Sequence, residues 1–188
     1  MARLLDANGV PEPRAPRTDV YAALVRAIVG QQLSTHAARA IYDRLLGRFD
    51  GTPPTPGQIL DDDPEALRVA AGLSHAKVAY LRSLAEHVQS GALEIDRLTE
   101  LSDDEVIAEL VAVKGIGAWT AHIFLMFTLG RPDVLAVGDL GIRRAAQRAY
   151  DLPALPTDAE LTTLAEPWRP HRTAACLVLW HSLANAPM

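Results

Sequence analysis

The tightest constraint on the fold is a Gly-Ile-Gly turn, Gly115–Gly117, that lies directly between two apolar segments. Glycine adopts the left-handed conformation that ends a helix, and a second glycine allows a tight reversal of the chain. Before the turn, apolar residues recur at helical spacing, and the segment after it is apolar almost all round. The sequence therefore predicts a helical hairpin over about residues 103–129, with the second helix central to the core.

The rest of the chain also reads as helical, because no segment shows the sustained two-residue alternation of a strand. Good N-cap residues or capping boxes precede several of the periodic segments. These are Asp19, Ser34, Ser74, Ser102 with Glu105, and Thr157 with Glu160. The predicted helices lie at about 20–30, 35–48, 56–61, 64–71, 74–90, 103–114, 118–129, 139–150, 157–166 and 170–184. The chain is therefore predicted to be all-α.

Composition sets the broad class. The chain has 188 residues, 49% of them hydrophobic, which is enough to build the core of one domain or of two small lobes. Residues 1–18 form a short charged arm that does not resemble a signal peptide, and the apolar run Ile123–Leu129 is too short to span a bilayer. We therefore expect a cytoplasmic monomer without a membrane segment.

Cys176 is the only cysteine, which excludes an intrachain disulfide and cysteine-ligated zinc or iron–sulfur sites. Its apolar surroundings favour a buried, inert thiol.

The Gly-Ile-Gly turn also predicts an anion site. A helix that begins at the turn presents backbone N–H groups and the positive end of its dipole, and glycine lets a phosphate approach closely. Lys114 adds a positive charge. Contacts of this kind grip a nucleic-acid backbone without reading its sequence. The formal net charge of −5 weighs against such a partner unless basic residues gather on one face. A purely structural helix corner is the alternative.

Asp139 is the carboxylate best placed for chemistry. It follows Val137-Gly138 and immediately precedes a predicted amphipathic helix. Aspartate is a common N-cap, and the N-terminal end of a helix stabilises a negative charge. A plain capping role and a catalytic role are compatible at this position.

Taken together, these motifs resemble a known family. The hairpin turn, Val137-Gly138-Asp139, Ile28–Ser34 and the segments Pro167–Arg172 and Leu179-Trp180 resemble the helix-hairpin-helix DNA glycosylase superfamily. The chain is most similar to its 3-methyladenine DNA glycosylase II branch. The resemblance implies a two-lobed all-helical glycosylase domain over residues 19–188, without the amino-terminal β lobe of some relatives. It implies an enzyme of base excision repair that flips alkylated purines out of double-stranded DNA and hydrolyses their N-glycosidic bond.

The resemblance also assigns roles to residues. Asp139 matches the catalytic aspartate, and Trp119 stands where bifunctional relatives carry a Schiff-base lysine, so a monofunctional enzyme is expected. The implied base pocket comprises Trp119, Trp168, His171, Gln31, Ile123 and Leu140. Gln32 and Leu33 lie where the family inserts a wedge into the gap left by the flipped base. The implied phosphate contacts are Lys114, Gly115, Gly117, Thr120, Arg143 and Arg144.

No cofactor is required by this reading. In the family, the hairpin can hold a structural monovalent cation on backbone carbonyls, which here belong to Val111, Val113 and Ile116.

Two other functions stay open. One is a non-catalytic helix-hairpin-helix module that binds DNA, although such a module has no need for Asp139. The other is a glycosylase for other damaged bases, whose commonest forms are opposed by Trp119 and by the missing cluster cysteines. His171, Leu140 and Ile123 stand where more aromatic character is expected, so the substrate range is less constrained than the reaction.

Overall fold

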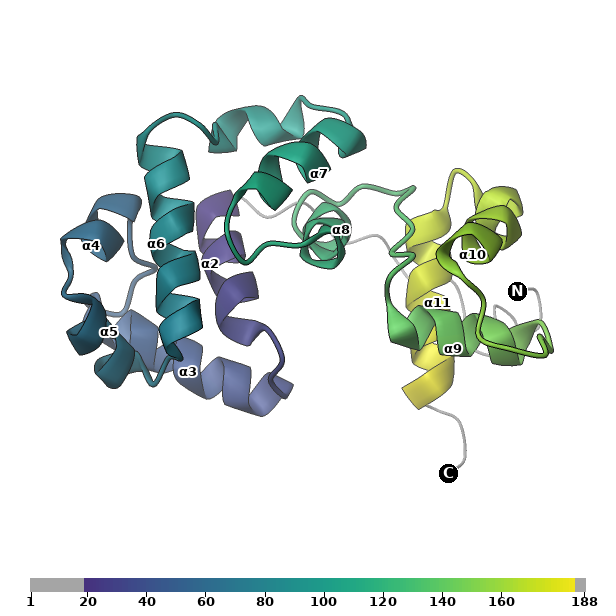
Figure 1. Ribbon diagram of the computed structural model, residues 1–188, viewed down its shortest axis with the longest axis horizontal. Coiled ribbons are helices and arrows are strands. Elements are labelled where there is room, and N and C mark those ends of the chain that lie inside the picture. The colour runs from purple at the N-terminus through teal and green to yellow at the C-terminus, as the bar shows by residue number, and fades with distance from the viewer. Residues whose placement is uncertain (1–18, 185–188) are drawn as a thin grey trace. The chain divides into compact units, whose positions relative to one another are not determined.

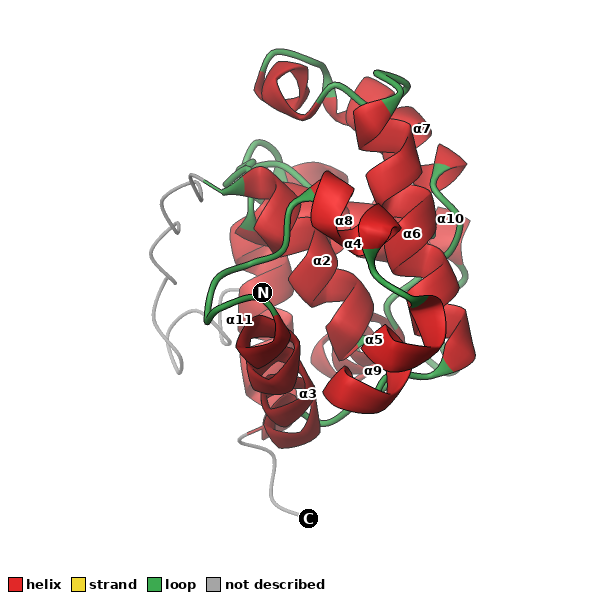
Figure 2. Cartoon of the chain, turned by 90° about the vertical axis from the view of Figure 1, so that its left-hand side faces the viewer, coloured by secondary structure: helices red, strands yellow, loops and turns green. Residues whose placement is uncertain are grey.

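The computed structural model describes residues 19–184, so the predicted arm at 1–18 lies outside the described residues. Within this range every regular element is a helix and none is a strand (Figures 1 and 2). The all-α prediction is therefore confirmed. The chain forms two compact units, a larger one that ends at Phe124 and a smaller one that begins at Leu125. None of the described helices combines the length and the apolar character needed to cross a bilayer.

The larger unit is built around α6, which packs against α2, α4 and α5, while α3 packs against α2 and α5. Leu24, Ile28, Leu45, Leu81 and Leu84 are fully buried in this core. Burying one such side chain stabilises the fold by roughly 1.5–3 kcal/mol. These helices are α2 (Val20–Gly30), α3 (Thr35–Arg48), α4 (Pro56–Asp61), α5 (Pro64–Ala71) and α6 (His75–Gln89).

The hairpin consists of α7 (Asp103–Ala112) and α8 (Ala118–Phe127), and a short 3-10 helix, η1 (Ile95–Thr99), precedes it. At the start of α7, the predicted capping box is present, since Glu105 Oε2 accepts the Ser102 N–H at 2.8 Å. Val106 and Leu110 fill the buried face of α7. Val111 lies one residue further along the helix, which turns it away from that face and leaves it 45% exposed.

The smaller unit contains α9 (Leu140–Ala149), α10 (Asp158–Ala165), the short η2 (Glu166–Trp168) and α11 (Arg172–Ala184). In this unit α9 packs against α11, and Ile142, Val178 and Leu179 are buried. The last helix begins at Arg172 instead of the expected Pro170. Its start is fixed by a residue far away in sequence, because the carboxylate of Asp133 accepts the backbone N–H of Arg172 at 3.2 Å.

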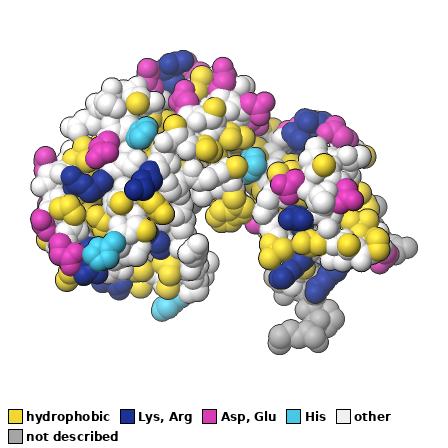
Figure 3. Space-filling view, viewed as in Figure 1, with side chains coloured by type: hydrophobic (Ala, Val, Ile, Leu, Met, Phe, Trp, Pro, Cys, Tyr) yellow, Lys and Arg dark blue, Asp and Glu magenta, His cyan; other side chains and the backbone are white. Residues whose placement is uncertain are grey.

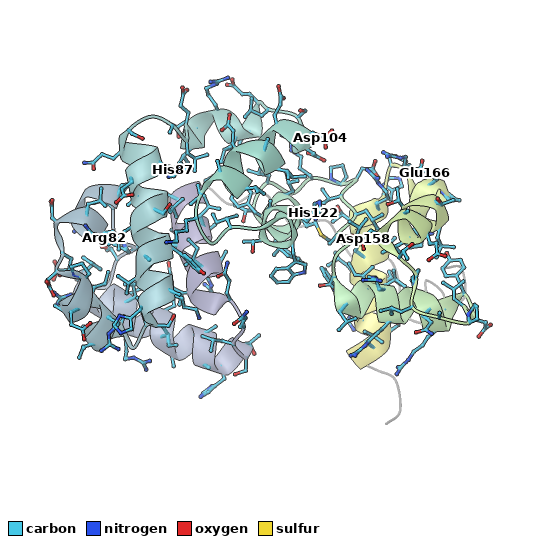
Figure 4. All side chains as sticks on the ribbon, in the orientation of Figure 1. Arg82, His87, Asp104, His122, Asp158 and Glu166 are labelled. Carbon is cyan, nitrogen blue, oxygen red and sulfur yellow. The ribbon has the colours of Figure 1, made fainter. Side chains whose placement is uncertain are left out.

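Two cationic side chains on α6 hold neighbouring helices. Arg82, labelled in Figure 4, donates from Nη1 to the carbonyls of Ile59 and Leu60 at the end of α4. Lys77 Nζ donates to the carbonyl of Val29 on α2 at 2.7 Å. Both cations occupy helix carboxyl ends, where carbonyl groups lack partners inside the helix.

Candidate active site and nucleic-acid interface

The hairpin turn requires glycine at Gly115. Its φ is +89°, and a Cβ added there would collide with the ring of Tyr80 on α6. The turn is closed by a hydrogen bond of 3.0 Å from the Ile116 N–H to the Val113 carbonyl. Gly115 therefore lets the hairpin turn pack directly against α6.

Gly117 is different, because the protein itself does not require glycine there. Its φ lies outside the left-handed region, and a Cβ added to it would meet nothing within 4 Å. Helix α8 begins at the next residue, and a helix leaves its first N–H groups without an acceptor inside the helix. Gly117 thus leaves an open approach to the positive end of α8.

A pocket of about 390 Å³ lies beside the turn in the larger unit. Its lining includes Gln31, Gln32, Gly115, Trp119 and Thr120, all of which the sequence had singled out. The Gln31 side chain ties the α2–α3 corner to the hairpin, since its Nε2 donates to the Gly115 carbonyl at 2.8 Å. The structure therefore gathers these five predicted residues around one concavity.

The corner that carries the wedge candidates is exposed. Gln32 has a φ of +57°, and its side chain is exposed. Leu33 is 37% exposed, whereas most leucines among the described residues are buried. Neither side chain is committed to the core, so both are available to meet a partner.

In the smaller unit, Asp139 caps α9 as predicted. Its Oδ1 accepts the Ile142 backbone N–H at 2.8 Å and also the indole N–H of Trp180 on α11 at 2.9 Å. Trp180 stacks on Phe127, with ring centroids 6.0 Å apart. A Cβ on Gly141 would lie 3.0 Å from Asp139 Oδ1 and 3.2 Å from Trp180 Cδ1, so glycine leaves room for this hydrogen bond.

Sequence reasoning did not single out Trp180 as a partner of Asp139. Trp180 was part of the motif that carried the resemblance, but no role followed from its position. The sequence did contain one signal of a shared contact surface. Arg172, Cys176 and Trp180 are spaced by four residues, which places their side chains on one face of the last helix.

The comparison with protein families decides where the chain belongs. The model for the HhH-GPD superfamily of base excision DNA repair proteins matches residues 25–170. The chain belongs to this superfamily. DNA-3-methyladenine glycosylase 1 of Schizosaccharomyces pombe is 38% identical over 175 residues, which cover 92% of this chain and 76% of the relative.

Solved structures agree with this assignment. The 3-methyladenine DNA glycosylase Mag1 of Schizosaccharomyces pombe, in complex with abasic DNA, matches with a TM-score of 0.85 and 36% identity, covering 98% of this chain and 91% of that one. A DNA-3-methyladenine glycosidase from Bacillus halodurans matches with a TM-score of 0.86 and 39% identity, covering 98% and 84%. The predicted family and its helical fold are therefore confirmed.

Other predicted site residues of this HhH-GPD chain have varied settings. Trp119 is 46% exposed, Ile123 is half-buried on the same helix, and Leu140, directly after Asp139, is 47% exposed. Trp168 is buried, and its indole N–H donates to the Tyr150 hydroxyl at 3.0 Å, which gives it a packing role. His171 is exposed just before α11. Roles of these residues in a base pocket stay predictions.

The predicted cationic phosphate contacts also differ among themselves. Lys114 is exposed, as is Arg144 on α9. Arg143 is partly committed, because its Nε donates to the Pro156 carbonyl at 2.7 Å and its Nη1 lies 3.9 Å from Asp158, a residue labelled in Figure 4. On the face drawn in Figure 3, basic and acidic side chains are interspersed, and the described residues form no continuous basic patch there.

No group of three or more His, Cys, Asp and Glu residues within residues 19–184 is arranged to hold a metal ion. Burial raises the pKa of the Cys176 thiol to about 12, which agrees with the predicted inert thiol. The predicted ligands of the monovalent cation, the carbonyl oxygens of Val111, Val113 and Ile116, are of a kind that can bind such an ion. Val113, for example, accepts one N–H from Ile116 and keeps a second lone pair.

Proposed function

We propose that this chain is a monofunctional DNA glycosylase that removes alkylated purines from double-stranded DNA during base excision repair. Membership of the HhH-GPD superfamily and similarity to proteins named DNA-3-methyladenine glycosylases support the reaction class. The single observation that carries the proposal is the Asp139 carboxylate, held by two N–H donors at the start of α9.

The proposed reaction needs one carboxylate and one water. The bond between C1′ of the sugar and the base nitrogen breaks, and its electron pair leaves with the base, so a cationic alkylated base departs neutral. Positive charge develops on the sugar, and the carboxylate of Asp139 stabilises it electrostatically. Water then bonds to C1′ and gives up a proton, for which Asp139 is the acceptor. The products are the free base and an abasic site.

Trp119 supports the proposal that the reaction stops at the abasic site, without cleavage of the DNA strand. A strand-cleaving glycosylase attacks the sugar with an amine and forms a Schiff base. The indole of Trp119 cannot do so. Half-exposed at the pocket beside the hairpin, this indole offers an aromatic face on which an electron-poor cationic base can stack.

The hairpin supports the proposed binding to the phosphate backbone of DNA. The start of α8 offers backbone N–H groups to a phosphate, and Gly117 leaves the approach open. Gln32 and Leu33 are proposed as the wedge that fills the gap left by the flipped base, because both are exposed on the corner next to this turn. A monovalent cation on the carbonyls of Val111, Val113 and Ile116 would stabilise the turn, and no step of the reaction depends on it.

An excision assay tests the function. Single-turnover release of 3-methyladenine, 7-methylguanine, 1-methyladenine, hypoxanthine and uracil is measured on duplex DNA with the wild type and with Asp139→Asn. We expect release of alkylated purines by the wild type. Asp139→Asn should bind the same DNA but release base at least about 100-fold more slowly, because it loses the charge that faces the developing cation.

The alternatives are separated by the same assay. Release of none of the five bases by the wild type, with DNA binding intact, would favour a non-catalytic module. Release of hypoxanthine or uracil alone would favour a glycosylase for other damaged bases. We further propose a cytoplasmic monomer, and light scattering after size-exclusion chromatography measures the oligomeric state.

A further inference from the structure

The segment that leads into Asp139 lies against one face of α11. We call residues 130–139 the Asp139 loop. Arg172, Cys176 and Trp180 are spaced by four residues, which puts their side chains on the same side of the helix. In this order they contact successive parts of the loop, from Asp133 to Asp139.

The contact at Asp133, in the first half of the loop, is a forked ion pair. Arg172 Nε donates to Asp133 Oδ1 at 2.7 Å, and Nη2 donates to Oδ2 at 3.0 Å. The same Nη2 reaches the Asp133 carbonyl at 2.6 Å, so the guanidinium holds side chain and backbone together. The Arg172 and Asp133 side chains are only 15% and 23% exposed. A planar fork of this kind fixes orientation as well as distance.

Thr173 and Cys176 hold the loop backbone on both sides of Asp133. Thr173 Oγ1 donates to the Arg131 carbonyl at 2.6 Å and accepts the Val134 N–H at 3.1 Å. Its own N–H donates to the Pro132 carbonyl at 3.0 Å. The Cys176 thiol lies 3.8 Å from the Val134 carbonyl. These contacts to α11 leave the backbone of the Asp139 loop few alternative conformations.

The contact at the end of the loop is the hydrogen bond from Trp180 to Asp139. Eight residues of helix separate Arg172 from Trp180, which is a rise of about 12 Å along a rigid rod. Because both ends of the loop are fixed to the same rod, the spacing between them is set by the helix.

We propose that Arg172 is a positioning residue for Asp139. Arg169 Nη1 also donates to Asp133 Oδ2 at 2.8 Å, and Arg172 adds the fork and the contact to the Asp133 carbonyl. By fixing the Asp133 backbone as well as its side chain, Arg172 sets the path of the Asp139 loop, so that the carboxylate meets both the Trp180 indole and the sugar of the flipped nucleotide. The catalytic part of this inference rests on the proposed function. A displacement of about 1 Å at a reacting group can slow a reaction about 100-fold, so a smaller displacement of Asp139 is expected to slow base release about tenfold or more.

A matched control exists in the larger unit. Arg48 forms the same fork with Asp62, with Nε to Oδ2 at 2.7 Å and Nη2 to Oδ1 at 2.6 Å. Neither residue belongs to the site. Arg172→Gln and Arg48→Gln therefore each remove one forked ion pair, but only the first removes an anchor of the Asp139 loop.

The first measurement is independent of activity. The indole N–H resonance of Trp180 is recorded by ¹H–¹⁵N NMR and assigned with Trp180→Phe. We expect Arg172→Gln to shift this resonance, because the carboxylate that accepts the N–H moves, while Arg48→Gln leaves it in place. An unchanged Trp180 resonance in folded Arg172→Gln would overturn the inference, whether or not the protein proves to be a glycosylase.

The second measurement separates positioning from folding. Affinity is measured for duplexes that carry a neutral tetrahydrofuran or a cationic pyrrolidine in place of the sugar. For Arg172→Gln we expect the preference for the cationic probe and the rate of base release each to fall about tenfold or more, with tetrahydrofuran affinity nearly unchanged. Arg172→Lys keeps the charge but loses the fork, and should recover only part of the loss.

The two hypotheses fail in different ways. If the wild type releases no base, the proposed function fails and the NMR result still decides the positioning role. If the wild type and Arg48→Gln release base and Arg172→Gln does so at the same rate, the positioning role fails and the proposed function stands. Equal loss of thermal stability in Arg172→Gln and Arg48→Gln, with slowed release in Arg172→Gln alone, supports positioning.

Discussion

At the residue scale, one oxygen of Asp139 receives two N–H groups that come from different elements. The Ile142 backbone N–H belongs to the helix that Asp139 caps, and the Trp180 indole N–H belongs to α11. A cap alone leaves the carboxylate able to turn about its own bond. A second donor from a packed ring, which itself stacks on Phe127, fixes the plane of the carboxylate.

This geometry predicts a specific effect of Trp180→Phe. Phenylalanine keeps the aromatic stacking on Phe127 but cannot donate a hydrogen bond to Asp139. We expect single-turnover base release to fall about tenfold or more, since a preorganised carboxylate loses one of its supports. Binding to duplex DNA, measured by fluorescence anisotropy, should change by less than about threefold, because the phosphate grip is made elsewhere.

Tyr150→Phe is the control for that substitution. It removes the partner of another indole hydrogen bond, the one from Trp168 at 3.0 Å, without touching Asp139. Base release should remain near the wild-type rate. Equal losses of rate in both variants would mean that packing in the smaller unit, and not the contact to Asp139, accounts for the effect of Trp180→Phe.

At the scale of elements, the sequence predicted the helix caps but not the contacts between residues far apart in the chain. Ser34, Ser74 and the capping boxes at Ser102 and Thr157 start helices as predicted, because a cap and its N–H donor lie within three residues. Asp139 also caps its helix as predicted. The partners Asp133 and Arg172 are 39 residues apart, and no periodicity links them. For the same reason the sequence did not predict that Trp180 donates a hydrogen bond to Asp139, 41 residues away.

The hairpin turn supplies a prediction from its two glycines. Gly115→Ala places a Cβ against Tyr80 at a φ of +89°, so we expect a loss of stability of about 2–4 kcal/mol from clash and backbone strain. Gly117→Ala places its Cβ in open space, so the melting temperature should hardly change. Its DNA affinity should nevertheless fall if the proposed phosphate site is correct, since the methyl group would stand in the approach to that site.

Thermal unfolding and anisotropy titrations on the same two proteins measure this contrast. The result is informative because the two substitutions are chemically identical and two residues apart. A Gly117→Ala variant that binds DNA as tightly as the wild type would remove the hairpin turn from the interface.

At the scale of the whole molecule, stability should depend on pH through His122, labelled on α8 in Figure 4. Burial lowers the pKa of His122, with a smaller opposing effect from Asp103, and its Nδ1 has no hydrogen-bond partner among the described residues. As pH falls below about 6.5, the unfolded chain takes up a proton before the folded one does. Stability due to this group is therefore present above pH 6.5 and is lost toward acid.

Denaturant unfolding at several pH values tests this expectation. Between pH 7 and pH 5 the free energy of unfolding should fall in the wild type and fall less in His122→Leu. His36→Leu, which changes an exposed histidine, should keep the wild-type slope. Parallel slopes in the wild type and His122→Leu would show that acid sensitivity has another origin.

The net charge of −5 constrains how the molecule can hold DNA. Each phosphate neutralised by a cationic side chain releases a counterion and adds about −0.9 to the slope of log K against log salt. In the proposed interface, backbone N–H groups at the start of α8 hold a phosphate without a charged side chain of their own, and of the predicted cationic contacts only Lys114 and Arg144 are exposed. We therefore expect a shallow slope, of about −2 to −4, for binding to duplex DNA without a lesion.

Two neighbouring arginines sharpen this expectation. Arg144 is exposed, so Arg144→Gln should weaken binding and reduce the magnitude of the slope by about one. Arg143 is held by the Pro156 carbonyl and lies near Asp158, so Arg143→Gln should leave the slope within about 0.3 of the wild type. Anisotropy titrations from low to physiological salt measure all three proteins. A wild-type slope of about −6 or steeper would mean that a cationic surface, and not the hairpin backbone, carries the affinity.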